Sequence, residues 1–377
     1  MARYRFDQIA INSTDKRKPE DKDQADYIGL EHLDSGSLKV TRWGSKVPLK
    51  GEKLVMKKGD VLFGKRNAYL RRAAISPHDG LFSAHGMVLR PKTEIVDPEF
   101  FPFFIGSDYF FDRAIKISVG SLSPTVNWRD LKKEEFDLPS IPEQKKLTKV
   151  LRAISITKYA YEDLVRQTDE LVKSQFIEMF GDPITNDRGW EYKKLPEVTE
   201  IVLGSTPSTK NPEYWDGELK WITPAELTDT SFYVYDTEKH ITERGAKDAG
   251  LKICPAETVL FSTRAPIGKT AIAGVDMYCN QGFKNFVCGP MIRPVFLYYL
   301  LTLKKDYFEG LGTGTTFKEL SRGMLEKVSI SVPPVEEQMQ FENLYRQSDK
   351  SKFELQYVNR NVKEMITCSQ KKIRLNR

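Results

Sequence analysis

The sequence LPSIPEQ at residues 138–144 occurs again, in altered form, as VPPVEEQ at residues 332–338. The offset between Gln144 and Gln338 is 194 residues, close to half of the 377-residue chain. The period of an internal repeat indicates the architecture of a protein, and a period of this length is far too long for a solenoid. It predicts two domains of one fold, each followed by the same kind of connector.

Further matches support this interpretation. The offset of 194 residues also relates YIGLEHL at 27–33 to WITPAEL at 221–227. A slightly larger offset relates VLFGKR at 61–66 to VLFSTR at 259–264. Short β-rich runs of this kind, bounded by Gly, Pro and Asp, predict strands, and aromatic-rich stretches later in each repeat predict a short core helix. The expected class is therefore α/β (α+β), with two similar globular domains.

Each connector is predicted to be a long helix. Between Pro142 and Phe180 there is no further glycine or proline, and Gly181-Asp182-Pro183 gives a typical helix end. Apolar residues recur in the first helix at Leu147, Val150, Ile154, Tyr161, Leu164, Leu171 and Met179. They recur in the second at Phe341, Leu344, Leu355, Val358, Val362, Met365 and Ile373. This spacing favours an antiparallel coiled-coil pair; the alternative is that each helix packs on its own domain.

The predicted organisation has four parts: domains at 1–140 and 182–333, a central helix at 141–181 and a C-terminal helix at 334–377. The net charge of +6 is consistent with a polyanionic partner, and equally with a solvated surface that favours lysine. The four cysteines form no CxxC pair and histidine is scarce, so neither a zinc site nor a disulfide framework is expected. The same cysteine usage fits a reducing cytoplasm, and with no apolar run after the first residues we expect neither a signal peptide nor a membrane span.

Catalytic motifs are weak throughout the sequence. Gly268-Lys269-Thr270 ends like a phosphate-binding loop, but Thr263 stands where the first glycine of that motif belongs. Asn211-Pro212-Glu213-Tyr214 differs from the Asn-Pro-Pro-Tyr box of adenine methyltransferases, and no glycine-rich cofactor loop lies near it. The turns at 118–121 and 312–316 suit close approach of a phosphate, but they are equally ordinary loops. The residues therefore favour binding over catalysis.

The doubled Pro-x-x-Glu-Gln helix entries, together with GSTPS at 204–208, NPEYW at 211–215 and NQGFKN at 280–285, resemble the specificity subunits of type I restriction-modification systems. The first repeat lacks the GSTPS segment and has SAHG at 83–86 in place of the asparagine-glutamine-glycine run. The resemblance implies two target-recognition domains that each read half of a split, asymmetric DNA site. It also implies two helices that set the spacer and dock two methyltransferase subunits, with ATP-dependent restriction subunits as further partners.

On this resemblance the chain itself is not an enzyme and carries no metal or cofactor. The docking candidates are the helix entries Pro142, Glu143, Gln144, Glu336, Glu337 and Gln338. Bases are read by Arg, Lys, Asn and Gln side chains, which gives the DNA-binding candidates Lys65, Arg66, Asn67, Arg71, Arg72, Lys210, Arg264, Lys269 and Lys284. Arg66 and Arg264 occupy matched places after a predicted strand and are the strongest of these; the alternative for each is a surface ion pair.

Two other classes of function remain open at this point. One is a self-sufficient DNA methyltransferase or nuclease, against which the weak motifs argue. The other is a coiled-coil scaffold that does not bind DNA. The target sequence does not follow from the residues, because the base code of each domain depends on loop geometry.

Overall fold

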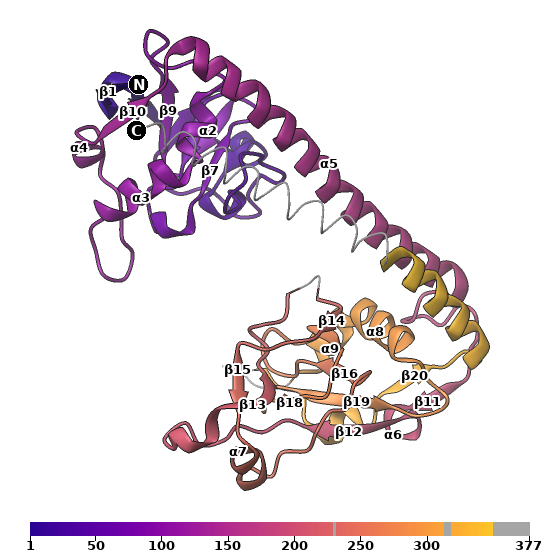
Figure 1. Cartoon of the computed structure of the whole chain (residues 1–377). Helices are drawn as coiled ribbons and strands as arrows, with labels where there is room; N and C mark the ends of the chain where they lie inside the picture. The colour runs from indigo at the N-terminus through magenta and orange to yellow at the C-terminus, as the bar shows by residue number, and fades with distance from the viewer. Residues whose placement is uncertain (229–230, 313–317, 350–377) are drawn as a thin grey trace. The chain divides into compact units, whose positions relative to one another are not determined.

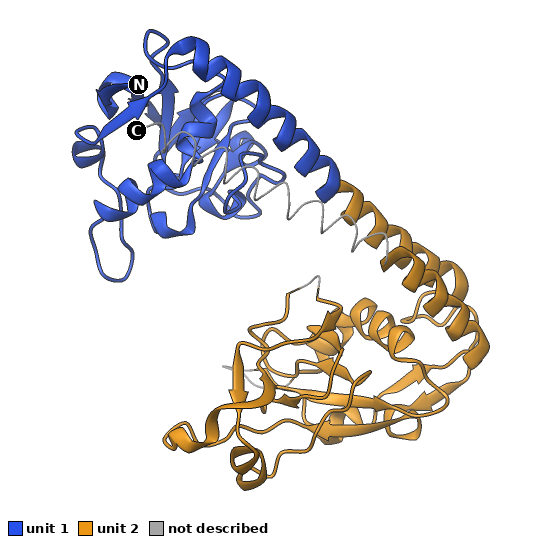
Figure 2. Cartoon of the chain, in the orientation of Figure 1, with its two compact units in different colours: residues 1–162, 356–377 blue, residues 163–355 orange. Residues whose placement is uncertain are grey.

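The computed structural model of the chain describes residues 1–228, 231–312 and 318–349 (Figure 1). They form two units, Met1–Glu162 and the described residues that follow from Asp163 onward (Figure 2). The boundary falls inside the long helix α5 (Ile141–Phe180), so one helix begins in the first unit and ends in the second. Within the described ranges, no helix is long and apolar enough to cross a bilayer.

Unit 1 contains two four-stranded sheets and a two-stranded ribbon. The first sheet has the order β2 (Ala10–Ser13), β9 (Met87–Pro91), β6 (Val61–Phe63), β7 (Ala73–Ile75). The second has the order β3 (Lys16–Arg17), β5 (Lys53–Met56), β8 (Gly80–Phe82), β4 (Tyr27–Ile28). The ribbon pairs β1 (Ala2–Arg5) with β10 (Glu135–Leu138). The short helices are α1 (Phe6–Ile9), α2 (Phe101–Ile105), α3 (Asp108–Lys116) and α4 (Trp128–Leu131).

Unit 2 repeats this plan. Its larger sheet has the order β12 (Thr199–Leu203), β19 (Lys284–Cys288), β16 (Val259–Phe261), β17 (Thr270–Ala273), β14 (Tyr233–Val234). Its smaller sheet has the order β15 (Lys239–Ile241), β13 (Trp215–Ile222), β18 (Tyr278–Cys279), and β11 (Tyr192–Lys194) pairs with β20 (Ser329–Ser331). The helices are α6 (Leu195–Val198), α7 (Glu243–Asp248), α8 (Pro294–Leu303), α9 (Lys305–Leu311) and α10 (Arg322–Leu325).

Strand pairing confirms the repeat read from the sequence. Tyr27 in β4 pairs in parallel with Leu81, and Trp221 in β13 pairs in parallel with Tyr278. The strands at 61–63 and 259–261 are β6 and β16, each between two antiparallel neighbours in its sheet. A one-residue slip would turn every side chain of a strand to the opposite face of its sheet. Because the equivalent strands of the two units pair in the same register, the two units share the same arrangement of strands.

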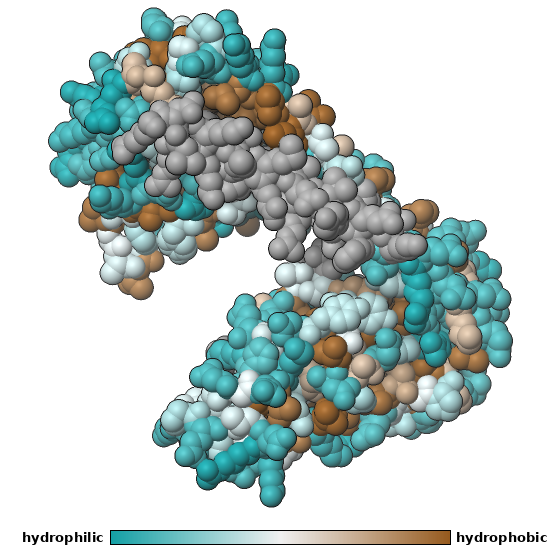
Figure 3. Space-filling view, in the orientation of Figure 1, coloured by the Kyte–Doolittle hydropathy of each residue, from teal (hydrophilic) through white to brown (hydrophobic). Residues whose placement is uncertain are grey.

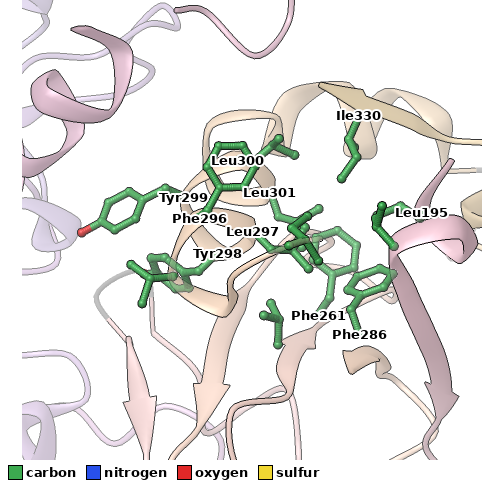
Figure 4. Packing of buried hydrophobic residues seen from close by; sticks show 14 of the residues in the cluster. Leu195, Phe261, Phe286, Phe296, Leu297, Tyr298, Tyr299, Leu300, Leu301 and Ile330 are labelled. Carbon is green, nitrogen blue, oxygen red and sulfur yellow. The ribbon is translucent and has the colours of Figure 1, made fainter. Parts of the chain in front are cut away.

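The aromatic-rich segments form core helices, as predicted. In unit 1, Phe101, Phe104 and Ile105 of α2 are buried. In unit 2, α8 is buried along nearly its whole length and lies over the larger sheet, where its side chains gather with Phe261 and Phe286 (Figure 4). A helix that is apolar all round is stable in water only when it is covered on all sides. These helices therefore anchor each core.

The long helix α5 packs at each end on the unit to which that end belongs. Leu151 and Ile154 are buried in unit 1, whereas Val172, Phe176 and Phe180 are buried in unit 2. The apolar stripe read from the sequence is wrong in part, because Val150, Leu164 and Leu171 of that stripe are exposed. Both ends of α5 are thus buried, the N-terminal end in unit 1 and the C-terminal end in unit 2.

The second long helix is described only at residues 335–349. Within unit 2 its Phe341 ring lies 5.3 Å from the Phe176 ring and 5.7 Å from the Phe180 ring of α5. The two helices therefore meet at this end. The rest of the expected coiled-coil seam, from Leu355 to Ile373, lies outside the described residues.

Candidate nucleic-acid interface

Most of the basic candidates lie in one loop of each unit, between two antiparallel strands. In unit 1 the loop of residues 64–72 joins β6 to β7. In unit 2 the loop of residues 262–269 joins β16 to β17. The first loop carries Lys65, Arg66, Asn67, Arg71 and Arg72, and the second carries Arg264 and Lys269. A loop held by a rigid sheet is a typical place for recognition residues.

Arg66 and Arg264 are structurally equivalent. Arg66 forms an isolated bridge with Thr125, and Arg264 forms one with Glu319. Both side chains are exposed. The Nη2 of Arg66 donates to the Ser123 hydroxyl at 3.1 Å. The sequence prediction that these two arginines occupy matched places is confirmed.

The surroundings of the two arginines differ in charge. Arg264 Nε donates to Glu319 Oε2 at 3.1 Å, and Glu319 also accepts from Lys284 Nζ at 3.2 Å. Partial burial alone would raise the pKa of Glu319, but Lys284 and Arg264 together hold it below its usual range. The alternative expected for Arg264, a surface ion pair, is therefore present in the structure. Arg66 has a hydroxyl where Arg264 has a carboxylate.

Lys284 and Lys269 are both held by hydrogen bonds within unit 2. It is the first residue of β19 and only 7% exposed, and its Nζ donates to Thr263 Oγ1 at 3.0 Å as well as to Glu319. Lys269 is half-buried, and its Nζ donates to the carbonyl oxygens of Leu227 at 2.5 Å and Pro224 at 3.3 Å. Buried ammonium groups need such partners. These bonds tie both lysines to neighbouring segments of unit 2, and their contact with DNA stays a prediction.

Two more candidates shape the loop of unit 1. Arg71 has a φ of 49° and pairs with Asp108 at 2.5 Å and Asp112 at 2.9 Å, which fixes the end of the loop to α3. Asn67 has a φ of 55°, a left-handed conformation that asparagine tolerates better than most residues. Its amide oxygen is buried without a hydrogen-bond partner among the described residues. Both residues therefore hold the loop in shape.

The remaining candidates are placed differently. Arg72 is half-buried and forms an isolated bridge with Ser35. Lys210 is exposed in the loop between β12 and β13, outside the β16–β17 loop. Lys65 is half-buried next to Arg66, and burial followed by the charge of Lys16 lowers its pKa. The structure thus leaves Lys65, Arg66, Lys210 and Arg264 as the candidates with the clearest access to a ligand.

The helix entries have a role that the sequence did not reveal. Gln144 is fully buried; its Oε1 accepts from the Asp97 amide at 2.8 Å, and its Nε2 donates to the carbonyls of Ile95 and Pro139 at 3.1 and 2.9 Å. A buried amide that finds all its partners on the backbone fastens the start of α5 to its own domain. We call this set of three bonds the glutamine latch.

Gln338 forms the same latch in unit 2. Its Oε1 accepts from the Arg293 amide at 2.8 Å, and its Nε2 donates to the carbonyls of Met291 and Pro333 at 3.1 and 2.7 Å. Like Gln144 it has no exposed surface. The expectation that the two glutamines dock a partner subunit is therefore wrong, since a fully buried side chain cannot reach one.

The other expected docking residues lie at the surface. Pro142, Glu143 and Glu336 are exposed and Glu337 is half-buried. Glu143 accepts from both the amide and the hydroxyl of Ser140, so it also caps the first turn of α5. In the described ranges, no group of three or more His, Cys, Asp or Glu side chains is arranged to hold a metal ion.

Two copies of one α/β domain, each with a basic loop on a sheet and each continuing into a long helix, define a paired recognition module. A family model described as the type I restriction modification DNA specificity domain matches residues 8–162 and again residues 187–361. The chain therefore belongs to this family and contains two copies of its domain.

Individual relatives agree. The specificity subunit of the type I restriction enzyme MjaIX from Methanocaldococcus jannaschii is 40% identical over 154 residues, a match that covers 40% of this chain and 36% of that relative. A second protein of that organism, named for the MjaX type I restriction enzyme, is 23% identical over 397 residues, covering 97% of this chain and 89% of its own. The solved type I restriction-modification S subunit of M. genitalium aligns over 99% of this chain and 95% of its own, with a TM-score of 0.55 and 12% identity. This last likeness supports the fold alone.

Proposed function

We propose that the chain is the DNA-recognition subunit of a type I restriction-modification complex and is not itself catalytic. Each unit reads one half of a bipartite, asymmetric site in double-stranded DNA. The observation that carries the proposal is the matched pair Arg66 and Arg264. Each arginine is exposed and forms the equivalent isolated β-bridge in its own unit. Two equivalent basic loops with different surrounding residues suit the recognition of two different half-sites.

In this proposal α5 and the helix at 335–349 belong to the connector that sets the spacer between the half-sites. They also dock two methyltransferase subunits, which methylate adenine N6 with S-adenosylmethionine, and restriction subunits add ATP-dependent translocation and cleavage. The long helix leaves apolar side chains exposed at Val150, Ile156, Leu164, Leu171 and Ile177. Hydrophobic residues appear among hydrophilic ones over α5 (Figure 3). Exposed apolar side chains of this kind suit a protein partner.

The test is to sequence the methylated bases of a host with and without the gene, together with its methyltransferase partner. We expect one bipartite motif that depends on the gene. Inserting four residues after Ala160, about one helical turn or 6 Å, should lengthen the spacer by about one or two base pairs. Both half-sites should stay the same, because neither recognition loop is altered.

The rival functions give different results in the same system. Methylation by the purified chain with labelled S-adenosylmethionine and DNA, and no partner, would make it a self-sufficient enzyme. A complex that assembles with the methyltransferase but neither shifts DNA nor changes its methylation pattern would make the chain a scaffold.

A further inference from the structure

We propose that unit 1 contains a built binding site for a phosphate group, in which Lys16 and Lys65 provide the positive charge. The inference rests on the proposed function in naming a DNA backbone phosphate as the ligand. It adds a specific pocket, and one lysine that no sequence pattern indicated.

The pocket has a volume of about 130 Å³ and brings together segments that are distant in the sequence. They are strand β2 and the residues after it, the starts of β3 and β9, strand β5, the β6–β7 loop, the turn at 84–86 and the start of α4. The lining residues include Lys16 and Lys65 with the polar side chains of Asn12, Thr14 and Asn127. Ammonium, amide and hydroxyl groups are the side chains that commonly hydrogen-bond phosphate oxygens.

The charge of the two lysines is not paired within the described residues, although Asp15, beside Lys16, accepts a hydrogen bond from the lining residue Ser13 at 3.2 Å. No Asp or Glu lines it. Among the described residues, neither Lys16 nor Lys65 has a carboxylate within ion-pair distance. Lys65 is half-buried, and burial together with the nearby charge of Lys16 lowers its pKa. Lys16 is exposed, but its charge still repels the half-buried Lys65, so an anion bound between the two would be stabilised.

At the equivalent position in unit 2, a lysine is paired with a carboxylate of the chain itself. The carbonyl of Lys65 accepts from the Val126 amide, and the carbonyl of Thr263 accepts from the Leu320 amide, so Lys65 and Thr263 are equivalent. Met87, which lines the pocket, begins β9 as Lys284 begins β19. In unit 2 the cation is Lys284, and Glu319 neutralises it.

The residue of unit 1 that matches Glu319 is Thr125, since each bridges the equivalent arginine. Unit 1 therefore has the cations without the internal carboxylate. An anion from outside the chain can therefore take the place that Glu319 has in unit 2. Because Lys65 immediately precedes the exposed Arg66, a backbone phosphate held here would place the neighbouring bases within reach of that arginine.

The experiment uses the full chain assembled with its methyltransferase subunit and compares Lys16→Gln/Lys65→Gln with Lys57→Gln/Lys58→Gln. The control pair removes the same charge from exposed positions in the turn before β6, at the opposite end of that strand from Lys65. Binding to duplex DNA is measured as a function of salt. We call Lys16→Gln/Lys65→Gln the pocket pair and Lys57→Gln/Lys58→Gln the control pair. Loss of one phosphate contact should make the slope of log K against log salt shallower by about 0.9 in the pocket pair, whereas the slope should be unchanged in the control pair. Lys16→Arg/Lys65→Arg, which keeps the charge, should restore most of the slope.

A second arm titrates inorganic phosphate into the full chain and follows the ³¹P line width. Broadening that the pocket pair abolishes, with an unchanged DNA slope, would keep the phosphate site but make a free anion its ligand. If the pocket pair behaves like the control pair in both arms, the site does not exist. If the wild-type complex fails to bind DNA, the proposed function fails, and the inorganic phosphate arm still decides the pocket by itself.

Discussion

The loop after β6 in unit 1 and the loop after β16 in unit 2 are built on the same frame, yet they treat positive charge in opposite ways. In unit 2, Arg264 and Lys284 both pair with Glu319. In unit 1, Arg66 meets Ser123 and Thr125, while Lys16 and Lys65 share a pocket without a carboxylate. The difference teaches that a shared fold fixes where a cation stands, whereas the residue bridged to the arginine, Thr125 or Glu319, decides whether that cation is paired within the chain.

The largest expected effect tests whether the frame itself is shared. Gln144→Leu and Gln338→Leu each leave one backbone amide and two backbone carbonyls without their side-chain partner, and some of these groups are only part-buried. An unmet buried group costs about 1–3 kcal/mol, and the part-buried groups can bind water instead, so we expect each variant to destabilise its own unit by about 3 kcal/mol. Chemical denaturation, followed by hydrogen exchange in each unit, measures the two losses. Clearly unequal losses would break the claim that the latches are equivalent.

The next effect concerns base reading. Arg66→Ala and Arg264→Ala should each weaken binding to the cognate site by about 1–3 kcal/mol if the arginine contacts a base. The loss should be confined to one half-site, and a different half-site for each variant. Competition binding with DNA mutated in either half measures this. A uniform loss on all sequences, with a salt slope shallower by about one, would assign the residue to a phosphate instead.

A smaller effect is expected from exchanging the residue that distinguishes the two loops. Glu319→Thr removes the carboxylate partner of Lys284, which stays buried but keeps its bond to Thr263. Because Glu319 is two-fifths exposed, at 40%, we expect a loss in unit 2 stability of only about 1 kcal/mol. Thr125→Glu should instead weaken DNA binding by supplying unit 1 with an internal anion. If the Thr125→Glu variant binds DNA like the wild type, an internal carboxylate at this position does not prevent the cations of unit 1 from binding DNA.

The smallest effect is the pH dependence of the stability that Glu319 contributes to unit 2. The pKa of Glu319 is lowered in the folded protein, so its contribution to stability is complete above the ordinary glutamate range and is lost as the pH falls through the lowered pKa. Wild type and Glu319→Gln should therefore converge in stability on acidification. Thr125→Val in unit 1 is the control, because threonine does not titrate. Thermal unfolding between neutral and acidic pH checks both, and a constant difference across that range would contradict the linkage.

The sequence was sufficient for elements whose signal is local. The repeated helix entries, the strands at 61–63 and 259–261 and the stop at Gly181, whose φ is 76°, all follow from residue type and spacing. Burial of polar side chains was not predictable in this way. Gln144 and Lys284 resemble surface residues in the sequence, and their partners are backbone or side-chain atoms contributed by distant segments. Lys16 was missed because the pocket forms only when separate segments fold together.

The apolar stripe of α5 shows a related limit. Heptad spacing selected Val150, Leu164 and Leu171, which are exposed, and missed Leu151, Val172 and Phe176, which are buried. Periodicity alone indicates that a helix has an apolar face, but which residues are covered depends on what packs there. Here one helix is covered by a different unit at each end, so no single stripe describes it.

The glutamine latch has a consequence for how such a chain can change over time. Every atom that Gln144 and Gln338 contact through the latch belongs to the main chain. Main-chain groups are the same whichever side chains a domain carries, so substitutions in the partner segments leave the joint intact as long as the backbone keeps its path. A recognition domain can therefore diverge, or be exchanged for another that carries the same entry sequence, without a new connection to the helix having to evolve.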